Sequence, residues 1–143
     1  MKTFFTFAIF LFFFNFNNAS SKESFFIEAK NLFNKKNYEK SKFLFQRNIV
    51  FNPKHAESYL YLAKIFEIEE NESEELKNVN TTLLLDPKNE EALYMLIDIK
   101  LERSNFTEVK KLQKRFEIAC NSLCEKKDSI EKRLKNFDTN NES

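Results

Sequence analysis

The 143-residue chain contains no glycine and no tryptophan, two prolines, two cysteines and one histidine. Phosphate-binding loops of the P-loop and dinucleotide types need residues that tolerate positive φ and close backbone approach, so the lack of glycine excludes those nucleotide enzymes. The single histidine, His55, excludes a multi-histidine metal centre. β-Sandwiches and barrels are also disfavoured, because they need many tight turns. With 42% hydrophobic and 31% charged residues, the sequence instead predicts one all-α domain.

The first 20 residues have the composition of a secretory signal peptide. Lys2 is followed by an uncharged apolar run from Phe4 to Phe14, which is shorter than the roughly 20 residues that a membrane-spanning helix needs. The small residues Ala19 and Ser20 suit a signal peptidase. We therefore expect cleavage near residue 20 and an exported mature chain with no stable membrane anchor. The bacterial periplasm is the favoured location, and secretion from the cell is the alternative.

The charges of the chain nearly cancel, with 23 Lys and Arg against 22 Asp and Glu. This balance gives no electrostatic reason to expect binding to nucleic acid or anionic lipid. No nucleophile stands beside a positioned base, and His55, which follows Pro53, is expected to be an exposed linker residue. We therefore expect no enzymatic activity, no small-molecule substrate and no cofactor. Six glutamates between Glu67 and Glu75 lack the pattern of a calcium loop and predict a solvated turn.

A 34-residue repeat organises the rest of the chain. Pro53 and Pro87 lie 34 positions apart, and each ends a stretch with helical apolar periodicity. Aligned in this period, the chain gives three units, 22–55, 56–89 and 90–123. Asparagine begins the second half of each unit, where its side chain can cap a new helix. The residues at equivalent positions are Phe25, Tyr59 and Leu93; Ala29, Ala63 and Ile97; and the capping residues Asn37, Asn71 and Asn105.

Residues 22–121 resemble the tetratricopeptide repeat (TPR) family. The segment Lys36-Asn37-Tyr38-Glu39-Lys40-Ser41, followed by Phe45, Asn48 and Pro53, is similar to the family's Gly-Asp-Tyr-x-x-Ala, aromatic, Ala and Pro pattern. Glu75 stands where the family has a small residue. The resemblance implies an α-solenoid of three helix–turn–helix units, within a domain spanning 21–137.

The solenoid needs a cap, because repeats of this kind cannot bury their apolar faces alone. Residues 125–137 are expected to form a capping helix, since Ile130, Leu134 and Phe137 are spaced four and three apart. Residues 138–143 are expected to be a disordered tail.

TPR arrays bind segments of other proteins on a concave surface lined by their first helices, and the resemblance implies the same for this chain. The partner is then another protein or a peptide segment, and the chain acts as an adaptor. A helix in a solenoid buries two faces, so each apolar residue on the surface has core packing as its alternative interpretation. The predicted partner-binding residues are Phe26, Lys30, Phe33, Leu60, Lys64, Tyr94 and Asp98.

Cys120 and Cys124 form a closely spaced pair at the start of the predicted cap. In an oxidising compartment such a pair favours a disulfide, and Cα atoms four residues apart on a helix are roughly 6 Å apart, within disulfide range. Free thiols, a redox-active pair and a metal site are the other interpretations. A metal site needs more ligands than this pair and His55 provide. The alternative function is therefore a thiol–disulfide accessory protein that uses the two cysteines.

Overall fold

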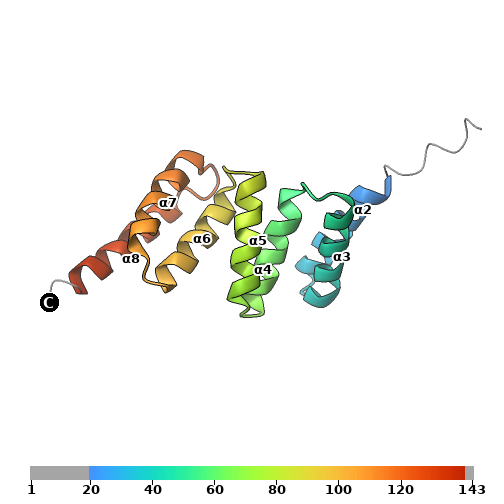
Figure 1. The fold of residues 1–143 in the computed structure, drawn as a ribbon, viewed down its shortest axis with the longest axis horizontal. Helices are drawn as coiled ribbons and strands as arrows, with labels where there is room; N and C mark the ends of the chain where they lie inside the picture. The colour runs from blue at the N-terminus through green and yellow to red at the C-terminus, as the bar shows by residue number, and fades with distance from the viewer. Residues whose placement is uncertain (1–19, 141–143) are drawn as a thin grey trace, which may run out of the picture. The chain divides into compact units, whose positions relative to one another are not determined.

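The computed structural model describes residues 20–140, which form seven α-helices and contain no strand (Figure 1). The predicted all-α repeat fold is confirmed. Most of the predicted signal peptide, residues 1–19, lies outside the described residues. None of the described helices is both long enough and apolar enough to cross a membrane. The helices are α2 (Ser20–Asn34), α3 (Tyr38–Phe51), α4 (Ala56–Ile68), α5 (Glu72–Leu85), α6 (Glu90–Glu102), α7 (Phe106–Ala119) and α8 (Lys126–Asn140).

The chain divides into two compact units. The N-terminal unit ends at Pro53 and contains the α2–α3 pair. The C-terminal unit starts at Lys54 and contains the α4–α5 pair, the α6–α7 pair and α8. In Figure 1 the two helices of each pair lie side by side and are joined by a short turn.

The same turn joins the two helices of every pair. Its left-handed residue is Lys36, Glu70 or Ser104, with φ of 59°, 55° and 54°. In the α4–α5 turn, the Glu70 N–H donates to the Glu67 carbonyl at 3.0 Å, and the Asn71 N–H donates to the Phe66 carbonyl at 2.8 Å. These two bonds are a Schellman motif, which satisfies the last carbonyls of the first helix.

The asparagine that ends each turn also caps the next helix. Asn71 Oδ1 accepts from the Glu74 N–H at 3.2 Å, and Asn37 and Asn105 do the same for α3 and α7. The three predicted caps are therefore confirmed. One asparagine completes the end of one helix and the start of the next.

Two further caps begin the first helices of the C-terminal unit. His55 Nδ1 accepts from the Ser58 N–H at 3.2 Å and caps α4, and Asn89 Oδ1 accepts from the Ala92 N–H at 3.0 Å and caps α6. The expectation that His55 is an exposed linker residue is wrong, because the free N–H groups of the first turn need an acceptor and the ring supplies it.

Apolar side chains from α4 to α8 form one continuous core in the C-terminal unit. The cap helix contributes Ile130, which is fully buried, and Leu134. Helix α8 continues to Asn140, three residues beyond its predicted end, because no proline or glycine follows to stop it. The most deeply buried core residues are Ala63, Val79, Ala92, Leu93, Ile97, Val109, Leu112, Phe116 and Ile130.

The N-terminal unit has its own, smaller contact between helices. Ala29 and Phe45 are fully buried, and the Ser41 hydroxyl donates to the Ala29 carbonyl at 2.8 Å. Phe25 stacks on Phe51 with ring centroids 5.8 Å apart. Small residues at 29 and 41 allow α2 and α3 to approach closely.

Glycine at the left-handed position of the α4–α5 turn should stabilise the chain. A residue with a Cβ atom at φ near 55° costs on the order of 1 kcal/mol, and glycine avoids this cost. The larger entropy that glycine loses on folding offsets part of the gain. We expect Glu70→Gly to raise the free energy of unfolding by up to about 1 kcal/mol, measured by urea denaturation.

Glu69→Gly is the matched control, because the neighbouring Glu69 has an ordinary φ of −82°. This variant should lower the free energy of unfolding by about 0.5–1 kcal/mol. Equal changes in the two variants would contradict the role assigned to residue 70.

Candidate partner-binding surface

Three of the predicted partner-binding residues lie on α2 in the N-terminal unit. Lys30 is exposed, whereas Phe26 and Phe33 are half-buried. The Phe26 ring packs against Phe45 with centroids 5.8 Å apart, and the Phe33 ring meets the edge of Tyr38 at 5.5 Å. Both phenylalanines therefore hold α2 against α3, and only part of each ring faces outward.

Leu60 belongs to the core of the C-terminal unit. Its side chain is 5% exposed and packs within the apolar cluster that extends from α4 to α8. The remainder lines a hollow of about 280 Å³ whose other walls are polar. The core interpretation therefore describes Leu60 best. The other lining residues are Glu57, Asn89, Glu90, Glu91, Ser122 and Leu123.

Lys64 and Tyr94 are half-buried on adjoining first helices. The Lys64 ammonium lies 2.5 Å from the Glu91 carboxylate of α6 and 4.9 Å from the centre of the Tyr61 ring. The Tyr94 ring packs against Phe116 of α7, with centroids 6.1 Å apart. These contacts fix both side chains on the surface of a rigid core.

Helix α8 extends this surface through two charged contacts with α6. Arg133 forms an ion pair and hydrogen bond with Asp98, and the Lys126 ammonium lies 5.8 Å from the centre of the Tyr94 ring. Burial raises the pKa of Asp98 above its usual value, although Arg133 and Lys126 act in the opposite direction. We call the surface made by Lys64, Glu91, Tyr94, Asp98, Lys126 and Arg133 the α4–α6–α8 face.

Carboxylates gather beside Asp98 at one part of this face. Burial raises the pKa of Glu67, and repulsion by Asp98 adds to the effect. Glu75 is only 9% exposed, and burial, followed by repulsion from Glu67 and Glu102, raises its pKa to about 7. The prediction of a wholly solvated turn is therefore wrong for Glu75, because its helix packs against α4 at the position where a small residue is usual. We call Glu67, Glu75, Asp98 and Glu102 the acidic cluster.

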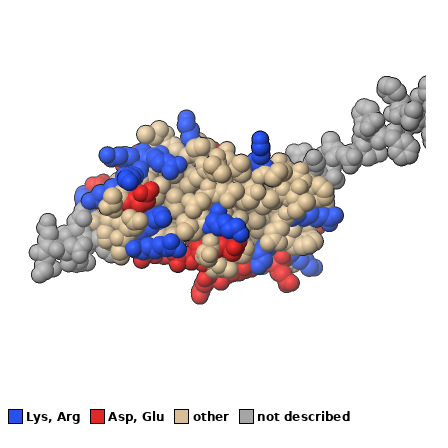
Figure 2. Space-filling model, in the orientation of Figure 1, with Lys and Arg blue, Asp and Glu red and all other residues tan. Residues whose placement is uncertain are grey.

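Charge is unevenly distributed along the C-terminal unit. Helices α4 and α5 together carry five glutamates and two lysines, whereas α7 and α8 carry nine Lys and Arg against five Asp and Glu. Figure 2 shows the basic side chains over the end that carries α7 and α8. In the residues that the structure describes, no group of three or more His, Cys, Asp or Glu side chains is placed to hold a metal ion.

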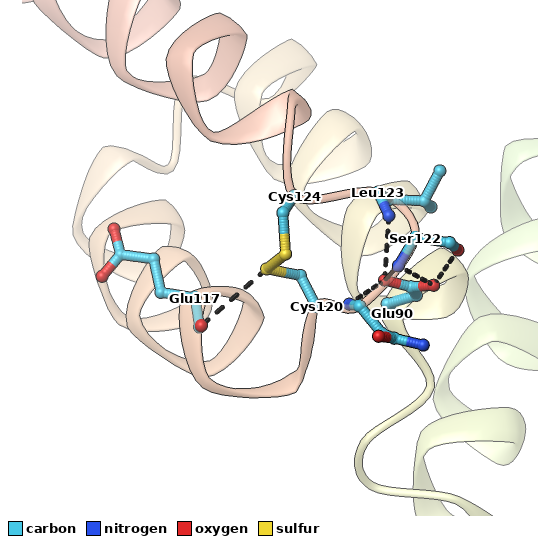
Figure 3. The surroundings of a disulfide bond; sticks show 7 residues. Glu90, Glu117, Cys120, Ser122, Leu123 and Cys124 are labelled. Atoms are coloured by element: carbon cyan, nitrogen blue, oxygen red, sulfur yellow. Dashed lines mark hydrogen bonds between the residues drawn. A yellow bond between two sulfur atoms is a disulfide. The ribbon is translucent and has the colours of Figure 1, made fainter.

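Cys120 and Cys124 form a disulfide in the loop between α7 and α8 (Figure 3). Their Sγ atoms are 2.18 Å apart and their Cα atoms 5.2 Å apart. Helix α7 ends at Ala119, and Cys120 has an extended backbone, so the pair spans a loop rather than a helical turn. The bond closes the small loop that leads into the cap helix.

The backbone of this loop binds the carboxylate of Glu90 at the start of α6. Glu90 accepts from the N–H groups of Asn121 at 2.6 Å, Ser122 at 3.0 Å and Leu123 at 3.1 Å, and also from the Ser122 hydroxyl (Figure 3). The Asn121 N–H, followed by the Ser122 hydroxyl, lowers the pKa of Glu90 to about 2. One carboxylate thus fastens the disulfide loop to a helix about 30 residues earlier in the chain.

Sequence reasoning did not select Glu90 or Arg133. Glu90 follows Pro87 closely, as acidic residues follow Pro53, but the other units have Lys22 and Ala56 at its repeat position. Arg133 lies in the cap, outside the repeat. Neither position therefore carried a periodic signal.

No family model matches the chain, and the search of curated proteins found no match. Solved structures do share its fold. The Yersinia enterocolitica type III secretion chaperone SycD, in complex with a peptide of the translocator YopD, is 14% identical, with a TM-score of 0.72 over 89% of this chain and 99% of that chain. The TPR2B domain of yeast Sti1, in a complex with pHsp70, is 14% identical, with a TM-score of 0.73 over 83% and 99%.

A third similar structure is the first TPR of Spaghetti (RPAP3) bound to the HSP90 peptide SRMEEVD. It is 11% identical, with a TM-score of 0.72 over 84% of this chain and 98% of that chain. The chain has the fold of tetratricopeptide repeat domains.

Removing the Glu90 charge should loosen the disulfide loop in a pH-dependent way. Because the folded pKa lies below the ordinary value of 4.5, the carboxylate stabilises the fold fully above pH 4.5, and this contribution is lost as the pH falls toward about 2. We expect Glu90→Gln to lower the free energy of unfolding at pH 7 by on the order of 1 kcal/mol. Urea denaturation at several pH values should show the difference from the parent shrinking between pH 4.5 and 2.

Glu91→Gln is the control for this experiment. Its carboxylate makes a single ion pair that is partly open to solvent, so its loss should have a smaller effect. A pH-independent effect of Glu90→Gln would refute the carboxylate contact.

The disulfide should be visible in the intact mass of the oxidised protein. Before reduction the mass should be two hydrogens lower than after reduction. Closing so short a loop removes little entropy from the unfolded chain, so reduction should lower the free energy of unfolding by only about 1–2 kcal/mol. Identical masses before and after reduction would exclude the bond.

Proposed function

We propose that the protein is an exported, non-enzymatic adaptor that binds a segment of another protein on the α4–α6–α8 face. The main support is the arrangement of Lys64, Tyr94 and Asp98. Each is half-buried on a first helix, and each is held by a contact with a neighbouring helix: Glu91, Phe116 and Arg133. The cost of ordering these side chains is therefore largely met before a partner binds.

The chemistry of the face suits a segment with both apolar and charged side chains. Tyr94 offers part of an aromatic ring, while Lys64, Glu91 and Asp98 offer charges of both signs within the same surface. Aromatic residues with a polar rim are typical of protein-binding surfaces. The polar hollow beside Leu60 gives such a segment room for a side chain.

Similar structures support a peptide as the partner. SycD was solved with a peptide of YopD, and the Spaghetti domain with an HSP90 peptide. Their identity to this chain is 14% and 11%, so they support the mode of binding and leave the partner to be found. By the same reasoning we propose capture of a partner segment rather than catalysis.

Export to the bacterial periplasm is the second part of the proposal. It is supported by the basic start and short apolar run of residues 1–20 and by the paired cysteines, since disulfides persist in oxidising compartments. Secretion from the cell is consistent with the same observations.

Crosslinking and co-purification from the native host test the adaptor function. Tagged protein from the envelope fraction should recover one dominant partner, and the double variant Lys64→Glu with Tyr94→Ala should recover at least tenfold less. Lys114→Glu makes the same charge change at an exposed position on α7 and should recover as much as the parent. Equal recovery by the parent and the double variant would contradict binding on this face.

Two further variants separate binding from folding and from thiol chemistry. Tyr94→Phe keeps the packing on Phe116, and its melting temperature shows whether a loss of partner reflects unfolding. Cys120→Ser with Cys124→Ser should still recover the partner. Recovery only as mixed disulfides through Cys120 or Cys124 would instead establish the thiol–disulfide accessory function.

A further inference from the structure

Glu75 is the most unusual side chain of the C-terminal unit. Only 9% of it is exposed, although it is a carboxylate, and within the described part of the chain it makes no ion pair and its side chain makes no hydrogen bond. None of the fully enclosed side-chain oxygens among those residues lacks a partner, so the Glu75 carboxylate still reaches solvent. A buried carboxylate without a counter-charge is costly and points to a missing cation.

The groups around Glu75 add negative charge instead of compensating it. The charges that act on it are all carboxylates, and burial together with this repulsion raises its pKa to about 7. These carboxylates come from three helices. They are Glu67 on α4, Glu72 on α5, and Asp98 and Glu102 on α6.

The nearby cations are held by other acids. Lys64 pairs with Glu91 at 2.5 Å, Arg103 pairs with Glu72 at 2.5 Å, and Arg133 pairs with Asp98. In the described residues this leaves Glu67, Glu75 and Glu102 without an ion pair. The α4–α6–α8 face therefore contains a concentrated negative charge that its own side chains do not neutralise.

Resting on the adaptor function proposed above, we propose that the bound segment places a lysine or arginine side chain over Glu75, between Glu67 and Glu102. A cationic side chain supplies the missing charge, and its aliphatic part covers the half-buried surface around the carboxylate. The three carboxylates come from different helices, so they surround one position from several sides. An inorganic ion is not favoured, because no three carboxylates in the described residues are placed to coordinate one.

Binding of synthetic peptides to the full chain tests this inference. Three fluorescent peptides of one amphipathic sequence carry lysine, glutamine or glutamate at the same polar positions. Fluorescence anisotropy at pH 7.5 and physiological salt should give the lysine peptide at least tenfold higher affinity than the glutamine peptide. The glutamate peptide should bind more weakly still.

Matched variants distinguish the acidic cluster from a general attraction. Glu67→Gln with Glu102→Gln should reduce the lysine preference at least fivefold. Glu69→Gln with Glu70→Gln removes the same charge from the exposed α4–α5 turn and should change it less than twofold. Equal losses in the two double variants would overturn the inference, as would equal affinity for the lysine and glutamine peptides.

Glu75→Gln gives a result that a purely structural role would not give. Removing a poorly solvated charge should raise the melting temperature at pH 7.5, yet the lysine preference should fall at least fivefold. A higher melting temperature with unchanged lysine preference would overturn the inference.

The outcomes also separate this inference from the adaptor function. If all three peptides bind equally, and Lys64→Glu with Tyr94→Ala abolishes the binding, the adaptor function stands and the cationic contact is refuted. If no peptide binds and the native partner is recovered equally well by that double variant, both are refuted.

Discussion

The architecture depends on one turn that is built without glycine. In each pair the chain must reverse within a few residues, and it does so by placing Lys36, Glu70 or Ser104 in the left-handed region. The asparagine that follows completes the Schellman motif of the first helix and caps the second. Without this reversal the paired helices could not meet, and the core that extends from α4 to α8 could not form.

Two glutamates of the C-terminal unit show how strongly the surroundings determine the behaviour of one chemical group. Backbone N–H groups and a hydroxyl lower the pKa of Glu90, whereas burial and neighbouring carboxylates raise that of Glu75. Stability therefore changes in opposite directions with pH. The Glu90 contribution appears as the pH rises from about 2 to 4.5, and the Glu75 contribution is lost as the pH rises from 4.5 to about 7. Glu90 fastens the cap loop, and Glu75 keeps a destabilising charge on the surface proposed for the partner.

The sequence determines the fold well because its signals are local and repeated. The 34-residue period, Pro53 and Pro87, and the capping asparagines each act within a few residues of where they occur. The site is less predictable, since it depends on contacts between residues about 30 apart, such as Glu90 with the 121–123 backbone and Asp98 with Arg133. Leu60 illustrates the limit, because periodicity places it on a first helix without deciding whether it faces the core.

The disulfide joins residues only four apart, so it adds almost nothing to the covalent connectivity of the helices. Noncovalent contacts alone hold α6, α7 and α8 together: the shared core, the Glu90 clasp and the Asp98–Arg133 pair. A single cut in the α6–α7 turn by a protease would therefore give two fragments that stay associated in native buffer. The fragments would separate on denaturing electrophoresis even without a reducing agent. Oxidation shapes a loop in this protein, and it leaves the array as easy to dismantle as a chain without cysteine.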